Sequence, residues 1–76
     1  MIFKVFYQAK KERSPRRETT QTLYLDIDTD DAKAGIIKAR EIVKDNTNYH
    51  VEFIDALSDE AVKYDQENGE FEVTKF

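Results

Sequence analysis

The chain has 76 residues, of which 39% are hydrophobic and 37% charged; it has no cysteine, and its net charge is −4. A chain this short buries only about 60% of the surface that its unfolded form exposes, and without cysteine it has no disulfide or thiolate metal site to compensate. No stretch approaches the ~20 apolar residues of a membrane span, and none resembles a secretory signal. Five Phe and four Tyr distinguish it from an acidic disordered chain. We therefore expect one folded domain over residues 1–76, located in the cytoplasm.

Charge is distributed unevenly along the chain. Residues 1–17 carry six positive charges and one negative charge, a net of +5, whereas the remaining 59 residues carry six positive and fifteen negative, a net of −9. An acidic body argues against general nucleic-acid binding, while a basic segment suggests a polar contact with an acidic partner surface. A solvated loop explains the basic run equally well. As partner contacts we expect the basic side chains of this run: Lys11, Arg13, Arg16 and Arg17.

Two strands are predicted in the first third of the chain. In residues 2–8, Phe3, Val5 and Tyr7 alternate with other residues, and Phe6 breaks the alternation, as suits a central strand covered on both faces. Residues 20–27 form the second strand, in which apolar side chains again alternate with polar ones.

A helix is predicted over residues 29–44, where apolar residues recur with a spacing of 3.6. Asp28 or Thr29 is expected to cap its N-terminus, with Asp30 and Asp31 in the first turn beside the positive end of the helix dipole.

Gly35 lies inside this helix. A glycine there costs roughly 1 kcal/mol relative to alanine, unless close packing against the sheet requires it.

The last third of the chain predicts one further strand and a hairpin. Tyr49, Val51 and Phe53 alternate with polar residues, which indicates a strand with these three side chains on one face. The Asn-Gly pair at 68–69, between apolar residues at 62–64 and 71–73, favours a β-hairpin. Residues 58–66 could instead form a short helix. The expected fold is α+β, in the order β-β-α-β-β-β, a mostly antiparallel sheet with one helix on one face.

Because a single helix covers only one face of such a sheet, the aromatic side chains on the other face, Phe6, Tyr24 and Phe76, are candidates for contact with a partner or for cross-strand packing. We expect Tyr7 and Tyr24 to make the apolar contacts.

Catalytic and metal-binding patterns fail in this sequence. His50 is the only histidine, and no nucleophile motif accompanies it, so we expect it to be solvated or at an interface. Asp26, Asp28 and Asp30 match the first positions of a calcium loop, but Asp31 replaces its glycine and the twelfth position is not glutamate. No cofactor is therefore expected.

Three stretches together, residues 1–8, 15–25 and 49–54, resemble the epsilon subunit of RNA polymerase from low-GC Gram-positive bacteria. KERSPRRETT followed by TLYLDID is most similar to the streptococcal and lactic-acid-bacterial branch. The resemblance implies a non-essential accessory subunit that binds the core enzyme through its β and β′ subunits, while the catalytic metal and nucleotide sites belong to other chains. It also implies a small sheet with a helix, similar to a phage-encoded polymerase inhibitor.

The leading hypothesis is therefore an accessory subunit that takes part in transcription without catalysing it, is monomeric when free, and binds neither specific nucleic-acid sequences nor membranes. The alternative is an independent acidic protein that mimics nucleic acid and inhibits at a basic channel. A third hypothesis, an enzyme acting through His50, requires a polar pocket around that residue.

Overall fold

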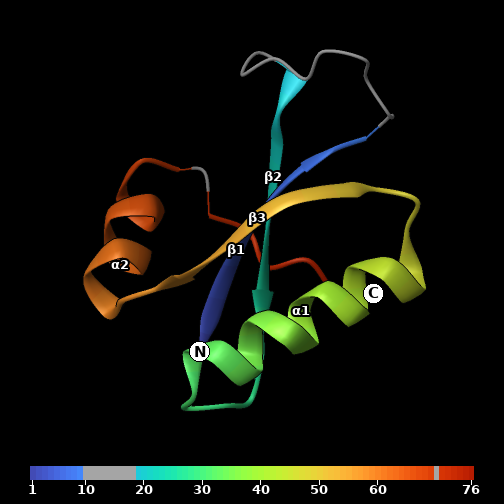
Figure 1. The fold of residues 1–76 in the computed structure, drawn as a ribbon. Coiled ribbons are helices and arrows are strands. Elements are labelled where there is room, and N and C mark those ends of the chain that lie inside the picture. Colours follow the sequence, from blue (N-terminus) through green and yellow to red (C-terminus); the bar gives the residue numbers. More distant parts are fainter. Residues whose placement is uncertain (10–18, 70) are drawn as a thin grey trace.

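The computed structural model describes residues 1–9, 19–69 and 71–76. Its elements in chain order are β1 (Ile2–Gln8), β2 (Gln21–Asp26), α1 (Ala32–Asn46), β3 (His50–Leu57) and α2 (Asp59–Glu67) (Figure 1). The order is thus β-β-α-β-α. The α+β class and the first four elements agree with the sequence analysis.

β1 is the central strand of a three-stranded antiparallel sheet with the order β2-β1-β3. In this register Val5 lies opposite both Leu23 of β2 and Ile54 of β3. The central position is the one that the non-alternating Phe6 indicated.

The hydrophobic core lies between this sheet and α1. Phe3 and Val5 of β1 are fully buried, and α1 turns Gly35, Ala39 and Val43 toward them. These three helical residues are spaced by four, so they form one stripe along the helix. Gly35 has no side chain and Ala39 has only a methyl group, so α1 can approach the sheet closely.

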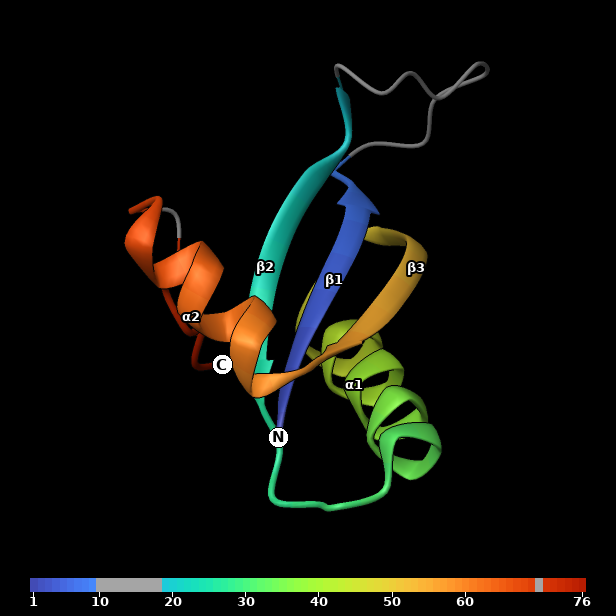
Figure 2. The ribbon, with the colours of Figure 1, turned by 90° about the vertical axis from the view of Figure 1, so that its left-hand side faces the viewer.

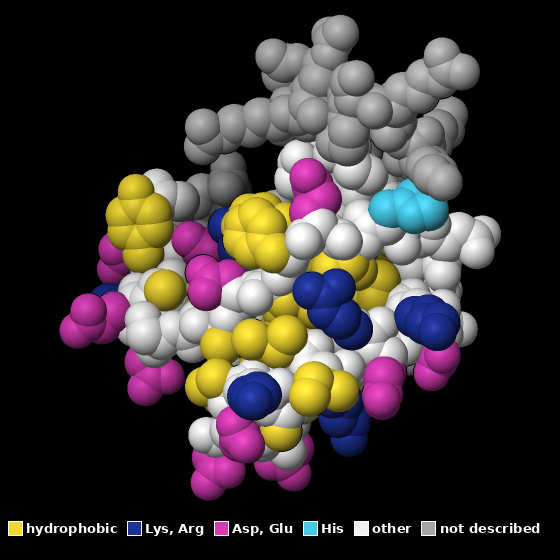
Figure 3. Space-filling model, in the orientation of Figure 1, with side chains coloured by type: hydrophobic (Ala, Val, Ile, Leu, Met, Phe, Trp, Pro, Cys, Tyr) yellow, Lys and Arg dark blue, Asp and Glu magenta, His cyan; other side chains and the backbone are white. Residues whose placement is uncertain are grey.

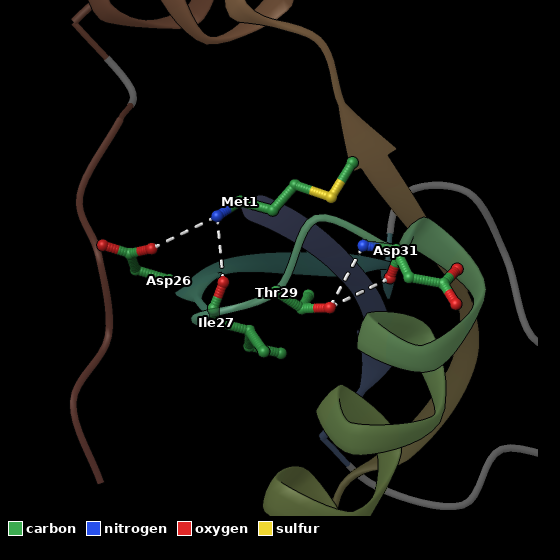
Figure 4. A network of polar contacts seen from close by, with 5 residues as sticks. All are labelled: Met1, Asp26, Ile27, Thr29 and Asp31. Atoms are coloured by element: carbon green, nitrogen blue, oxygen red, sulfur yellow. Dashed lines mark hydrogen bonds and ion pairs between the residues drawn. The ribbon is translucent and has the colours of Figure 1, made fainter.

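α1 begins later than predicted, because Asp31 is its N-cap rather than Asp28 or Thr29. The Asp31 carboxylate accepts hydrogen bonds from the backbone nitrogens of Lys33 and Ala34 at 3.0 and 3.5 Å. The Thr29 hydroxyl in turn accepts from the Asp31 nitrogen at 3.1 Å (Figure 4). Thr29 therefore shapes the turn before the helix, and no acidic residue occupies the first helical turn.

The same close-up shows how the start of β1 is attached to the end of β2. The α-amino nitrogen of Met1 donates to the carbonyl of Ile27 at 2.9 Å and lies 3.7 Å from the Asp26 carboxylate (Figure 4). The Ile27 nitrogen returns a 2.9 Å bond to the Met1 carbonyl. This reciprocal pair extends the β1–β2 ladder by one residue.

A β-bulge at Glu52 interrupts the simple alternation that the sequence predicted for β3. Phe6 pairs with Phe53, but Tyr7 pairs with Val51, so Glu52 has no partner position on β1. One inserted residue reverses the faces of those that follow it. Phe53 therefore lies on the face away from α1, and not on the face that Val51 shares with the core.

The predicted C-terminal hairpin is wrong, and the short-helix alternative is confirmed as α2. The Ser58 hydroxyl accepts from the Ala61 nitrogen at 3.2 Å and caps the helix. Asn68 and Gly69 end it: Gly69 has φ of 74°, and its nitrogen donates to the Gln66 carbonyl. The Asn-Gly pair thus supplies the left-handed residue of a helix C-terminus, which needs the same positive φ as a hairpin turn.

α1 and α2 lie on opposite sides of the strands, so the expectation of one helix on one face is also wrong (Figure 2). The segment after α2 runs beside β2, where Val73 forms a parallel bridge with Tyr24 and the Thr74 nitrogen donates to the Tyr24 carbonyl at 2.8 Å. Of the two expected hairpin strands, only this bridge remains.

Candidate partner-binding surface

The structure describes two of the six residues that the sequence suggested as partner contacts. Four of them, Lys11, Arg13, Arg16 and Arg17, lie outside the described residues. The two tyrosines are described, and both side chains are buried in the chain itself.

Tyr7 faces the core side of β1 and is only 7% exposed. Its ring stacks on Tyr49, with centroids 4.2 Å apart and an interplanar angle of 18°, and its hydroxyl donates to the Gln21 side chain at 3.3 Å. Burial, together with the neighbouring Tyr49 hydroxyl, raises the pKa of Tyr7 above its usual value. The buried Tyr7 ring therefore holds the more exposed Tyr49 ring in position through stacking.

Tyr24 lies on the other face of the sheet and is 3% exposed, because α2 and the following segment cover it. Its hydroxyl donates to the Asp65 carboxylate of α2 at 2.7 Å, and its ring contacts Phe71 at a centroid distance of 4.9 Å. Lys4 of β1 forms an ion pair with the same Asp65 oxygen at 3.4 Å. The Lys4 ammonium also lies 5.4 Å from the ring centroids of Tyr24 and Phe6.

These contacts shift the pKa values of the three polar groups. The hydrogen bond from Tyr24, followed by the Lys4 contact, holds the pKa of Asp65 below 3.8 although burial opposes this. Burial and the bond to Asp65 raise the pKa of Tyr24. Burial alone would lower the pKa of Lys4, but its contacts with Tyr24 and Asp65 raise it. The network thus attaches α2 to the sheet through a charged hydrogen-bonded pair.

Beside this network an aromatic pair reaches the surface. The rings of Phe6 and Phe53 are stacked with centroids 4.2 Å apart and an interplanar angle of 15°, and Phe53 remains 53% exposed. In the space-filling view, hydrophobic side chains are exposed over β3 with acidic side chains beside them (Figure 3). Since fully burying a Phe side chain is worth about 1.5–3 kcal/mol, this exposed ring leaves hydrophobic free energy available for binding.

Acidic residues flank the pair on the same strand. Asp55 lies two positions after Phe53, opposite Lys4, and is exposed. Glu52 accepts hydrogen bonds from Thr20 at 2.7 Å and from Gln8 at 3.3 Å. The surface that we call the aromatic surface consists of Phe6 and Phe53 with these two carboxylates as its rim.

Phe53 is the residue that sequence reasoning missed, because simple alternation placed it in the core. The signal was Ile54: two consecutive apolar residues in a half-buried strand require either coverage of both faces or a bulge.

The structure also places the residues that the sequence analysis weighed for catalysis and for calcium binding. His50 is exposed at the start of β3. Within the described ranges, no three His, Cys, Asp or Glu side chains are grouped so that they could hold a metal ion. In the calcium-like stretch, Asp31 acts as the cap of α1.

The fold and this surface together define a small α+β protein with an exposed aromatic pair. Comparison with known proteins identifies the family: the model of the RNA polymerase epsilon subunit matches residues 2–75. The chain belongs to this family, which confirms the resemblance noted in the sequence.

Similar proteins agree along the full length. The chain is 62% identical to the DNA-directed RNA polymerase subunit epsilon of Lactococcus lactis subsp. lactis (strain IL1403), over all 76 residues of both. The corresponding subunits of Streptococcus thermophilus (strain CNRZ 1066) and Streptococcus gordonii are 58% and 54% identical over the same full length. In the described part of the chain, no helix has the length and apolar character needed to cross a bilayer.

Proposed function

We propose that this chain binds the RNA polymerase core through the β and β′ subunits in the cytoplasm and takes part in transcription as an accessory subunit without catalysing it. The observation that carries the proposal is the family match over residues 2–75, together with full-length relatives described as polymerase epsilon subunits. The catalytic metal and nucleotide sites would then belong to the large subunits.

The aromatic surface supports a protein partner. Protein interfaces are enriched in aromatic side chains at their centre and have a polar rim. The stacked pair of Phe6 and Phe53, with Glu52 and Asp55 beside it, has this arrangement. We therefore place one contact with the core enzyme here.

The basic side chains predicted from the sequence remain part of the proposal as polar contacts. For the two tyrosines the burial suggests an indirect role, since little of either ring is available to a partner. Tyr7 would support Tyr49, and Tyr24 would hold α2 in place through Asp65.

Co-purification with polymerase tests the function and the basic side chains of residues 11–17 together. Tagged chain isolated from native lysate should carry the β and β′ subunits, identified by mass spectrometry. The R16E/R17E variant should bind the purified core more weakly, with the largest difference at low salt, because exposed charges act through screened electrostatics. K33E/K38E, a charge reversal of equal size on exposed residues of α1, is the control. Absence of β and β′ from the isolate would overturn the function, whereas equal binding of R16E/R17E at all salt concentrations would remove only these basic side chains from the interface.

The same complex distinguishes the nucleic-acid mimic. An accessory subunit should leave promoter DNA binding intact, whereas an acidic mimic should be displaced by DNA in a competition titration.

A further inference from the structure

A shallow hollow lies where the C-terminal end of α1 meets the start of β3. It has a volume of about 570 Å³ and is lined by Arg40 and Lys44 from the helix, His50 and Val51 from the strand, and the connecting residues between them. In the space-filling view, Lys and Arg side chains and the histidine lie on this side of the molecule, with acidic side chains beside them (Figure 3). The hollow is separate from the aromatic surface, whose residues do not line it.

The lining is cationic although the chain as a whole is acidic. Among its seven residues are an arginine, a lysine and the only histidine, and none is Asp or Glu, whereas acidic residues outnumber basic ones by 16 to 12 in the chain. Neither Arg40 nor Lys44 forms an ion pair with a described residue. They are four residues apart on one helix face, where like charges repel each other.

The helix dipole accounts for only part of this cluster. Lys44 lies in the last turn of α1, where a positive charge is favourable on its own. Arg40 lies one turn earlier, and His50 lies on another element, so the dipole does not explain why they converge. Glu41 and Asp45 are on the same helix but do not line the hollow.

The segment that connects α1 to β3 and lines the hollow is held in place by hydrogen bonds and ring stacking. The Thr47 hydroxyl donates to the Val43 carbonyl at 2.7 Å and accepts from the Tyr49 nitrogen at 3.1 Å. The Tyr49 ring is stacked on the buried Tyr7. The connection that carries the lining residues is therefore fixed at both ends, which reduces the ordering cost of binding.

We propose that this hollow binds a carboxylate-bearing segment of the RNA polymerase core. The inference rests on the proposed function and adds a second contact to it. Arg40 offers a fork of donors that matches a carboxylate, and Lys44 and His50 supply further donors. An acidic peptide fits better than nucleic acid, because it brings only a few negative charges to the hollow, whereas a phosphate backbone brings a continuous row of charges that the net charge of −9 on residues 18–76 repels more strongly.

Affinity measurements with purified core enzyme test the proposal. R40Q/K44Q should bind roughly tenfold more weakly than the original chain, and the salt dependence of binding should become shallower. K33Q/K38Q is the matched control: it removes two exposed charges from the same helix outside the hollow, and it should bind within about twofold of the original. Circular dichroism checks that both variants fold.

Carbodiimide cross-linking gives an independent readout, because the reagent joins an amine directly to a carboxylate in contact with it. In the complex, Lys44 should be joined to an Asp or Glu of a core subunit; K44R should remove this product, whereas K38R, on the same helix but outside the hollow, should leave it in place.

The outcomes separate the two proposals. If the original chain binds the core but R40Q/K44Q binds equally well, the hollow is not a contact and the function stands. If R40Q/K44Q instead loses binding to DNA and not to the core, the occupant is nucleic acid and the proposal is overturned. If the original chain does not bind the core, both proposals fail.

Discussion

Gly35 of α1 lies directly against the ring of Phe3 in β1: a Cβ atom at position 35 would overlap the ring carbons of Phe3. Phe3 is fully buried, so its ring has no space into which to withdraw. The glycine therefore sets the distance between helix and sheet, which is the close packing that would justify a glycine in the interior of a helix.

Replacing Gly35 with alanine should accordingly destabilise the protein. Alanine favours the helix by roughly 1 kcal/mol, but overpacking of a filled core typically costs about 1–3 kcal/mol and more where a side chain cannot move. We expect a net loss in the free energy of unfolding measured by urea denaturation, with partial recovery in the F3L/G35A double variant. A G35A protein as stable as the original would contradict the close approach.

The N-cap of α1 gives a second test. D31A should lower the free energy of unfolding by about 1 kcal/mol, because it removes the acceptor for two backbone nitrogens. D28A and D30A, at exposed neighbouring positions, should change it by less than about 0.5 kcal/mol. Thermal unfolding of the three variants measures this, and a larger loss in D28A than in D31A would return the cap to the position expected from the sequence.

Asp65 should give the protein an acid-sensitive contribution to stability. Its pKa is lowered in the folded state, so the folded chain binds fewer protons at this site than the unfolded chain does. The contribution is fully present above the ordinary value of 3.8 and is lost as the pH falls through the lower folded pKa. D65N should therefore reduce stability near neutral pH and flatten the decline below pH 3.8.

Urea unfolding from neutral pH down to about pH 2 measures this dependence. E67Q is the control, because Glu67 is an exposed acid on the same helix, and it should leave the acid profile unchanged. Y24F should act like D65N in direction, since it removes the hydrogen bond that most lowers the pKa of Asp65. Identical acid profiles for D65N and the original chain would show that α2 is not held through this carboxylate.

Phe53 should matter for binding more than for folding. F53S removes an aromatic ring that is 53% exposed, so we expect at most about 1–1.5 kcal/mol of lost stability and a reduction of roughly tenfold or more in affinity for the polymerase core. F76S is a matched control because Phe76 is 52% exposed and lines a different hollow, with Leu25 and Ile42, that includes neither ring of the aromatic pair. Calorimetric titration with purified core enzyme compares the two, and equal affinities would remove the aromatic surface from the interface.

The sequence by itself determined the features that depend on local periodicity. The alternation in residues 2–8 and the 3.6-residue stripe of α1 gave the strands, the helix and the core side of the central strand, because these patterns follow directly from backbone geometry. The family resemblance was also present in the sequence and is confirmed by the match over residues 2–75. The sequence did not determine the N-cap of α1, because several adjacent Asp and Thr residues can each accept hydrogen bonds from the first backbone nitrogens of the helix.

Only the tertiary structure decided what depends on long-range pairing. The bulge at Glu52 exists because β3 must pair with β1 while its apolar residues reach both faces, and this reversal brings Phe53 to the surface. The Asn-Gly pair suits a hairpin or a helix end equally. The helix α2 is favoured by the hydrogen bonds that Tyr24 and Lys4 donate to Asp65 across 41 and 61 residues. Local sequence preferences do not reveal contacts between residues so far apart in the chain, because these contacts stabilise the protein only after folding has brought the residues together.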